Sequence, residues 1–168
     1  MTANRYLATF EKEVLDWQTK LGNMNENNVQ WGEIQRTWSF LESLFMHSEE
    51  VKKELPVQSE QFKGIDAKVR TIFADAFKQK IALIFYNLEH IKGDFDKIEK
   101  ELKVCEKALY DFMASKQKKF PRFYFVASAD LLDILSNGNN PAKIMKHMPK
   151  IFQAVDTLEL EDLGQNRF

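Results

Sequence analysis

The chain has 168 residues, a length that fits one domain or one block of a longer rod. Its hydrophobic fraction is 44%, and Gly (6) and Pro (4) are scarce, which excludes a disordered chain and a many-turned all-β fold. The formal net charge of -1 provides no global attraction to nucleic acid or to an anionic membrane.

The cysteine content and the lengths of the apolar runs indicate the cellular compartment of the protein. The single cysteine, Cys105, closes no disulfide within the chain and holds no zinc alone, which favours a reducing environment. No apolar run approaches the ~20 residues that span a bilayer. The first six residues lack the basic-then-apolar layout of a signal peptide. We therefore expect a soluble, cytosolic protein or an excerpt of a longer one.

Apolar residues recur at steps of three and four through the first 45 residues, which predicts two helices. Gly22 and the asparagine-rich stretch 23–28 predict a break between them. We expect the two helices to form an antiparallel pair or to pack on a shared third element. The first apolar seam consists of Leu7, Phe10, Val14, Trp17 and Leu21, and the second of Trp31, Ile34, Trp38, Leu41 and Phe45.

A short helix is predicted after Ser48, because serine caps helices and acids follow in the first turn. It should end before Pro56, since the residue preceding a proline disfavours the helical region. The next helix is predicted from about Ser59 to Lys80. Residues 81–85 are apolar without a clear period, so the sequence leaves open whether this helix continues or turns there.

The most regular element follows, with an apolar seam of more than three heptads. At 1.5 Å per residue, about 30 residues form a rod of roughly 45 Å. Cys105 occupies a seam position, which predicts a small buried hydrophobe and not a reactive thiol. The seam residues are Leu88, Ile91, Phe95, Ile98, Leu102, Cys105, Leu109 and Phe112.

The pattern changes at residues 120–126, Phe-Pro-Arg-Phe-Tyr-Phe-Val. Pro121 excludes the preceding residue from a helix, and the aromatic run favours an extended segment. We expect this run to be mainly buried, with Phe123 and Phe125 packing the long helix against a following one at 128–137. Asn140 should cap a last amphipathic stretch that Pro149 interrupts.

These elements predict an all-α fold, an elongated antiparallel helical bundle with a short extended aromatic segment near 120–126. Along the chain we expect a first helical block at 1–80 and a long seam helix at 81–119. An aromatic motif with short helices should occupy 120–158, and a tail 159–168.

No pattern in the chain predicts chemistry. No glycine stands in a phosphate-binding loop, and no His-Glu-x-x-His or Cys-x-x-Cys motif exists. The acids Asp94, Asp96 and Glu99 lack the spacing of a calcium loop and predict a solvated helix face. We therefore predict no catalytic, cofactor-binding or metal-binding residue.

One basic and aromatic cluster resembles a nucleic-acid platform, because Lys116 to Lys119 and Arg122 accompany the aromatic run. Cations in the last turn of a long helix also complement its dipole, and such an aromatic run is usually buried. The second explanation is preferred, so nucleic acid is not an expected partner, and neither is a membrane.

Two motifs resemble a known family, the dynein heavy chains. Residues 119–126, Lys-Phe-Pro-Arg-Phe-Tyr-Phe-Val, followed by 129–136, Ala-Asp-Leu-Leu-Asp-Ile-Leu-Ser, look like the signature of the linker region, N-terminal region 2. The upstream motif at 31–45 is similar to a second signature of that region, and Leu55-Pro56 also matches in order. Segments 104–109 and 135–139 look more like axonemal outer-arm heavy chains of the beta type than like cytoplasmic ones.

The resemblance implies a function that composition does not. The linker of this family is a helical lever across a ring of ATPase modules, and its bending produces the power stroke along microtubules. The segment would be non-catalytic, with ATP and Mg bound in the parent motor's ring. Implied partners are the ring modules of the same heavy chain and, through the parent complex, intermediate and light chains and microtubules. The implied location is the cytoskeleton, in the axoneme of a cilium or flagellum.

The family motifs supply candidate packing or docking residues, and the segment 120–126 is a candidate pivot or docking face. Two alternatives remain open: a freestanding helical scaffold that binds other proteins, and a helical nucleic-acid-binding module. The motif residues are Trp31, Ile34, Gln35, Trp38, Leu41, Glu42, Phe45, Phe120, Pro121, Arg122, Phe123, Tyr124, Phe125, Leu131, Leu132, Ile134 and Leu135.

Overall fold

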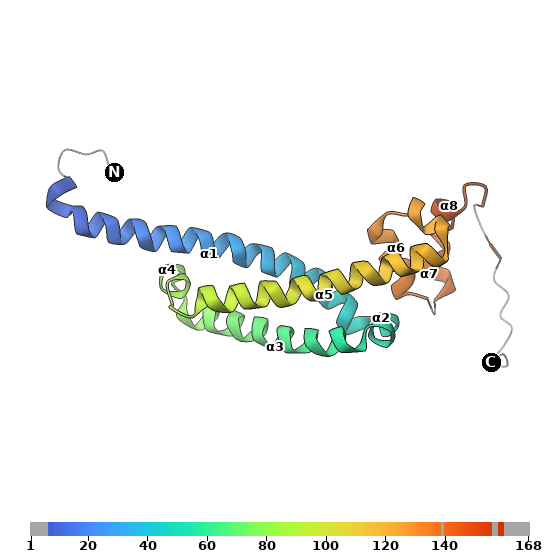
Figure 1. The fold of residues 1–168 in the computed structure, drawn as a ribbon, viewed down its shortest axis with the longest axis horizontal. Coiled ribbons are helices and arrows are strands. Elements are labelled where there is room, and N and C mark those ends of the chain that lie inside the picture. The colour runs from blue at the N-terminus through green and yellow to red at the C-terminus, as the bar shows by residue number, and fades with distance from the viewer. Residues whose placement is uncertain (1–6, 139, 156–157, 160–168) are drawn as a thin grey trace. The chain divides into compact units, whose positions relative to one another are not determined.

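The predicted all-α class is confirmed by the structure, a computed structural model that describes residues 7–138, 140–155 and 158–159. Within these residues there are eight α-helices, one 3₁₀ helix and no strand (Figure 1). Most of the predicted tail, 160–168, lies outside the described residues. The helices are α1 (Leu7–His47), α2 (Glu49–Glu54), α3 (Pro56–Gln79), α4 (Ala82–Tyr86), α5 (Ile91–Lys119), the 3₁₀ helix η1 (Pro121–Phe125), α6 (Ser128–Ser136), α7 (Pro141–Met145) and α8 (Met148–Ile151).

The chain forms two compact units, each assembled from two separate stretches. Unit 1 comprises 1–42 and 60–105, and unit 2 comprises 43–59 and 106–168. The predicted blocks follow one another along the chain, whereas each unit combines residues from both halves of the sequence. This arrangement arises because the long helices α1, α3 and α5 each run through both units.

The break predicted at residues 22–28 is wrong, because α1 is one helix through this stretch. Its asparagines are satisfied by tertiary contacts: Asn27 donates to the Tyr86 carbonyl at 2.8 Å, and the Tyr86 hydroxyl donates to Asn28 at 3.0 Å. Gly22 costs the helix only about 1 kcal/mol relative to alanine. Packing and side-chain hydrogen bonds therefore outweigh the local helix-breaking preference.

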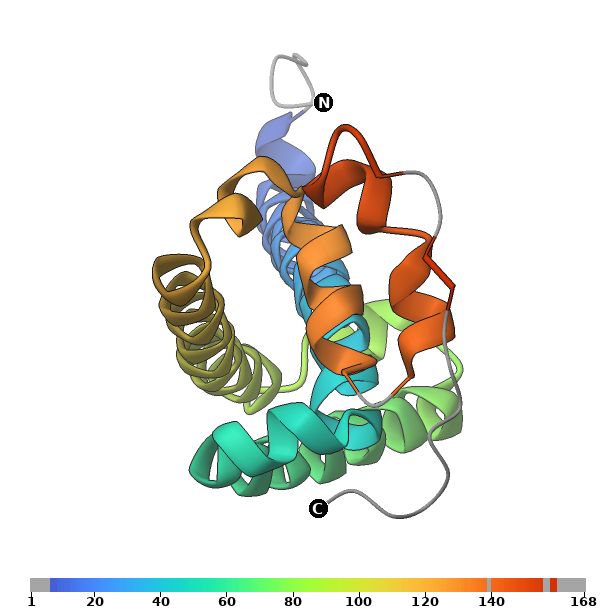
Figure 2. The same ribbon diagram turned by 90° about the vertical axis from the view of Figure 1, so that its right-hand side faces the viewer.

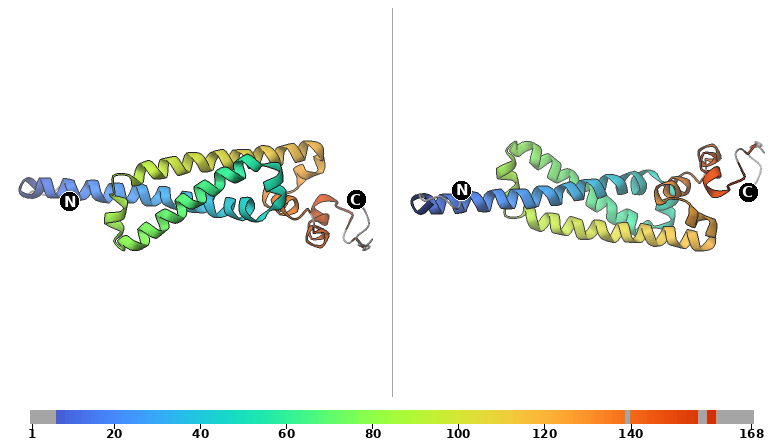
Figure 3. Two further views of the ribbon diagram at one scale, coloured as in Figure 1. Left: turned by 90° about the horizontal axis from the view of Figure 1, so that it is seen from below. Right: turned by 90° about the horizontal axis from the view of Figure 1, so that it is seen from above.

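The core of unit 1 lies among α1, α3 and α5, which run alongside one another (Figure 3). The predicted seam of α5 is buried here, from Ile91 through Phe95 to Leu102, with each side chain at most 2% exposed. Trp31 of α1 stacks on Phe95, with ring centroids 5.0 Å apart and an interplanar angle of 9°. The apolar seam of α5 is thus covered by α1 and α3, as its three–four spacing requires.

The helix boundaries after Pro56 differ from those predicted. α3 begins at Pro56 itself, where proline suits the first helical position, and Ser59 donates back to the Leu55 carbonyl at 2.8 Å. It ends at Gln79, because the next residue, Lys80, has a φ of 57°, a left-handed conformation that cannot continue a helix. The short helix α4 follows, so the long seam helix begins at Ile91 and not near residue 81.

Unit 2 contains the short helices, with α6 packed against both α2 and α7, and α8 against η1 (Figure 2). The two predicted caps are confirmed: Ser48 accepts from the Val51 amide at 3.3 Å, and Asn140 accepts from the Lys143 amide at 3.3 Å. Leu131 of α6 is fully buried at the centre of this packing.

The extended segment predicted at 120–126 is a short 3₁₀ helix, η1, flanked by extended residues. Only Phe120 (φ -132°, ψ 90°) and Val126 (φ -96°, ψ 133°) have extended backbones. Pro121 fixes φ near -65°, which a 3₁₀ turn accommodates as readily as an extended strand does. The aromatic side chains therefore follow a tight turn and cannot all reach one core.

Candidate functional site

The tryptophan motif is a set of core anchors in unit 1. Besides its stacking on Phe95, Trp31 makes an edge contact with Phe73, at 5.2 Å between centroids and 61° between planes. Ile34 and Leu41 are fully buried one and three turns later. These buried side chains hold the helices of unit 1 against one another.

Trp38 and Glu42 of the same motif join two charged residues of α3 in a polar cluster at the edge of that core. Asp66 accepts hydrogen bonds from Trp38 Nε1 at 3.2 Å and from Arg70 Nε at 2.8 Å, and Arg70 Nη2 donates to Glu42 at 3.0 Å. The hydrogen bond and charge of Asp66 raise the pKa of Arg70 above its ordinary value. The cluster therefore ties α1 to α3 through fixed charges, and Gln35 lies half-buried nearby on α1.

The aromatic motif is only partly buried, so the prediction that the run is mainly buried is wrong. Phe120 and Phe123 make an edge-to-face pair at 4.8 Å, and Phe123 is half-buried. Tyr124 is 59% exposed and Phe125 is 84% exposed. The residue that instead enters the core is Val126.

The inner side of this motif is fastened to the segment after α8. Arg122 Nη1 donates to the Ile151 carbonyl at 3.5 Å, and its guanidinium lies 4.8 Å from the Phe152 ring centroid. Leu131, Leu132 and Ile134 of the following motif are buried, and Leu135 is half-buried. A packed platform thus presents Tyr124 and Phe125 on its outside, and we call these two residues the η1 aromatic surface.

The predicted first seam of α1 is also uncovered. Trp17 and Leu21 share one face of the helix, and Trp17 is 52% exposed. Phe10, 56% exposed, precedes them at a kink where its backbone is non-helical (φ -124°, ψ 17°). Figures 1 and 3 show why: this part of α1 projects past the turn that joins α3, α4 and α5. The side chain of Leu7 lies outside the described residues. We call Phe10, Trp17 and Leu21 the α1 seam surface.

The basic cluster is partly neutralised by an acidic neighbour. Lys116 Nζ pairs with Glu54 at 2.6 Å and lies 5.0 Å from the Phe112 ring centroid. The hydrogen bond and charge of Lys116 lower the pKa of Glu54. The cation that begins the cluster therefore serves packing within unit 2.

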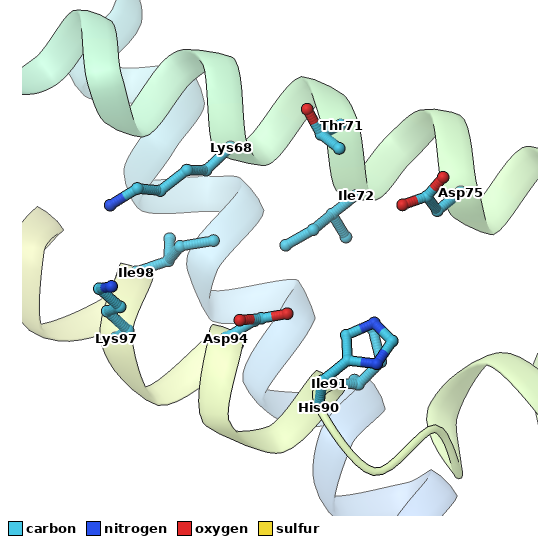
Figure 4. Close-up of a pocket in the computed structure, with 9 residues that line it drawn as sticks. All are labelled: Lys68, Thr71, Ile72, Asp75, His90, Ile91, Asp94, Lys97 and Ile98. Atoms are coloured by element: carbon cyan, nitrogen blue, oxygen red, sulfur yellow. The ribbon is translucent and has the colours of Figure 1, made fainter.

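An open groove of about 270 Å³ lies between α3 and α5 in unit 1 (Figure 4). Its floor is apolar and its rim carries charges of both signs, a mixture typical of the boundary between two packed helices. The lining residues are Lys68, Thr71, Ile72, Asp75, His90, Ile91, Asp94, Lys97 and Ile98.

The part of the chain that the structure describes holds no group of three or more His, Cys, Asp or Glu residues that could bind a metal ion. The acids predicted to be a solvated face are hydrogen-bonded to a neighbour: Gln30 donates to Asp96 at 2.9 Å and to Glu99 at 2.8 Å. Within the same residues, no helix is long and apolar enough to cross a bilayer.

Comparison with known proteins decides the family. Residues 1–167 match the family described as dynein heavy chain, N-terminal region 2. The chain belongs to this family. The resemblance predicted from the motifs at 31–45 and 119–136 is thereby confirmed.

Individual relatives cover nearly the whole dynein segment. It is 52% identical over 96% of its length to the dynein alpha chain of the flagellar outer arm of Chlamydomonas reinhardtii. It is 41% identical over 93% of its length to human dynein axonemal heavy chain 17, and 40% identical over 96% to the ciliary dynein beta chain of Heliocidaris crassispina. In each case the segment spans 4% of the relative's length.

The predicted likeness to outer-arm heavy chains is confirmed, but the beta type is not singled out. Identity to the alpha chain, 52%, exceeds the 40% to the beta chain. Segments 104–109 and 135–139 contain too few positions to separate two closely related types.

Sequence reasoning missed the polar residues that fix the dynein segment's helices. Asn27, only 4% exposed, binds the end of α4, and the largely buried Asp66 joins Trp38 to Arg70. The available signal was their position: Asn27 lies close to the apolar seam between Leu21 and Trp31. A polar residue there indicates a specific partner as well as a possible helix end.

Cys105 is predicted to react with thiol reagents only when the dynein segment unfolds. The side chain is fully buried, and burial, assisted by the Glu101 carboxylate, raises the thiol pKa from 9.0 to about 11. The thiolate is the reactive form, so it is nearly absent from the folded protein at pH 8. Reaction with a chromophoric disulfide at pH 8 should be slow in buffer and fast in denaturant.

The raised pKa of the Cys105 thiol makes the stability of the folded state depend on pH. The folded state retains the thiol proton more tightly than the unfolded state, so this contribution to stability is present below about pH 9 and is lost toward pH 11. Because the sequence has one cysteine, the reaction reports a single residue. Rapid labelling in native buffer would contradict the buried position of Cys105.

Proposed function

We propose that this chain is a non-catalytic segment of the linker of an axonemal dynein heavy chain. It would transmit the conformational change of an ATPase ring as a power stroke along microtubules in a cilium or flagellum. ATP and Mg would bind in ring modules outside this sequence. Family membership and the axonemal names of the relatives support this assignment.

The observation that carries the proposal is the uncovered η1 aromatic surface on an otherwise well-packed helical platform. Tyr124 and Phe125 are largely exposed, whereas Val126 and Leu131 beside them in the chain are buried. Large aromatic side chains on a rigid support are typical anchors of protein interfaces. A segment that spans 4% of its relatives has ample heavy chain to contact. The ring modules of the same chain are the proposed partner.

The α1 seam surface supports a lever that continues beyond this segment. The spacing of Trp17 and Leu21 leads along α1 toward the buried Trp31, so the apolar seam changes from uncovered to covered along the helix that follows the kink at Phe10. A lever transmits load when its helices are packed without interruption, because close-packed cores deform little. A further helix of the heavy chain would cover the remaining part.

The test is a double substitution, Tyr124→Ala with Phe125→Ala, in the heavy chain that carries this segment. Surface substitutions usually change stability by less than about 0.5 kcal/mol, so the segment should fold normally. Removal of an interface anchor typically costs about 2 kcal/mol or more of binding energy. We expect microtubule gliding to slow severalfold while ATP hydrolysis continues, which is loss of coupling.

A matched control is Tyr110→Ala, which removes a half-exposed aromatic residue from α5 in the same unit. This variant should glide at the normal speed. Normal gliding by the double variant would contradict a docking role for η1. Coupling that survives deletion of the whole segment would instead favour the freestanding scaffold.

A further inference from the structure

His147 is a buried histidine held between two carboxylates in unit 2. It lies between α7 and α8, and its side chain is 5% exposed. Nε2 is 2.6 Å from Asp133 Oδ2, and Nδ1 is 3.5 Å from Asp130 Oδ1. Both aspartates belong to α6, three residues apart, so they lie on one face of that helix.

The surrounding charges are arranged in pairs. Lys146 Nζ lies 2.8 Å from Asp133 Oδ2, and Lys150 Nζ lies 2.8 Å from Asp130 Oδ1. The hydrogen bonds of Lys146 and His147 lower the pKa of Asp133, which keeps this carboxylate ionised. His147 therefore joins two carboxylates that each already hold a lysine.

The other packed elements direct their charges elsewhere. Asn137 of the α6 end donates to Asp133 Oδ1 at 3.0 Å and accepts from Lys143 Nζ at 3.2 Å. Arg122 of η1 points at the Ile151 carbonyl and the Phe152 ring. Glu50 of α2 lies beside Gly138, beyond the end of α6. The charged groups nearest the imidazole are thus two aspartates and two lysines.

The two carboxylates interact differently with the neutral and the protonated ring. A neutral imidazole carries one N–H, so one of its nitrogens would present a lone pair to a carboxylate. Nδ1 is buried and makes no hydrogen bond with the described residues, and Asp130 lies beside it at 3.5 Å. An imidazolium has an N–H on each nitrogen and therefore attracts both Asp130 and Asp133.

We propose that His147 is a proton-controlled latch that fastens α7 and α8 onto α6. In the protonated state the imidazolium joins both aspartates across the packed helices. On deprotonation one carboxylate faces a lone pair, and only the exposed lysine pairs remain to hold that side. The latch contribution is therefore present while the ring carries both N–H protons and is lost when one of them leaves.

The latch affects the contact between α8 and η1, next to the η1 aromatic surface. α8 packs against η1, and Arg122 bonds to the Ile151 carbonyl at the end of α8. Loosening α7 and α8 would therefore loosen the support of η1. The inference rests on the contacts within unit 2 and does not depend on the proposed motor function.

The first experiment observes the ring directly in the ¹⁵N-labelled 168-residue chain. At pH 6 the imidazole nitrogens of His147 should both show imidazolium chemical shifts, with each N–H protected from solvent. A neutral ring with a single N–H at pH 6 would overturn the latch. This measurement needs no substitution, so it does not depend on a variant folding.

The second experiment compares melting temperatures of wild type and His147→Gln between pH 6 and pH 8. Glutamine retains a donor and cannot titrate. Wild type should lose about 2–4 °C more than the variant over this interval. The matched control is His90→Gln, which removes an exposed histidine and should retain the wild-type pH dependence. Identical pH profiles for wild type and His147→Gln would overturn the proposal.

Discussion

Replacing Phe95 by alanine is expected to lower the free energy of unfolding by about 3–5 kcal/mol. Phe95 is 0% exposed and stacks on Trp31, so its removal leaves a cavity and an unpartnered indole face in the core of unit 1. Small domains have a total stability of about 5–15 kcal/mol, so the variant should be close to unfolding at room temperature. Urea unfolding followed by circular dichroism measures the loss.

Phe77 offers a control of the same residue type in the same unit. It lies on α3 with 81% of its side chain exposed, so Phe77→Ala should change stability by less than about 0.5 kcal/mol. Equal losses for the two phenylalanines would contradict the packing of α5 against α1.

Replacing Leu131 by alanine is expected to cost about 2–5 kcal/mol in unit 2. Leu131 is 0% exposed on α6, which packs against α2 and α7, so these short helices share its burial. None of the three is longer than nine residues, and short helices rely on tertiary packing. The loss should appear in urea unfolding and as faster amide exchange in α6.

Leu21→Ala is the matched control, because Leu21 is 53% exposed within the α1 seam surface. Alanine is at least as good a helix former as leucine, so this substitution should be nearly neutral. A loss similar to that of Leu131→Ala would mean that another molecule or another copy covers the seam in solution.

The helical class and several boundaries could be read from the sequence. The three–four spacing of α5 identified residues from Ile91 to Phe112 that are buried in the structure. A row of apolar side chains along one helix face is removed from water only when that face packs against other helices. The caps at Ser48 and Asn140 were also predictable, since a side chain that bonds a nearby amide needs no distant partner.

The candidate site was only half predictable. The residue types at 120–126 identified the motif, but apolarity predicted burial for Phe125, which is instead exposed. Hydrophobicity favours burial only when the backbone directs a side chain toward a core, and the turn of η1 directs Phe125 outward. The same limit applies to Trp17, which the three–four spacing assigns to an apolar seam but which is 52% exposed.

By itself, the sequence determined the all-α class, the buried seam of α5, which motifs the chain shares with dynein heavy chains, and that Cys105 is a core residue. Only the tertiary structure decided that α1 continues through Asn27, because Asn27 donates a hydrogen bond to the backbone carbonyl of Tyr86, 59 residues away. It alone decided that His147 meets Asp133. Local preferences are set by neighbours in sequence, whereas burial and charge pairing are set by neighbours in space. For Phe125 and Asn27 the neighbours in space decided the outcome.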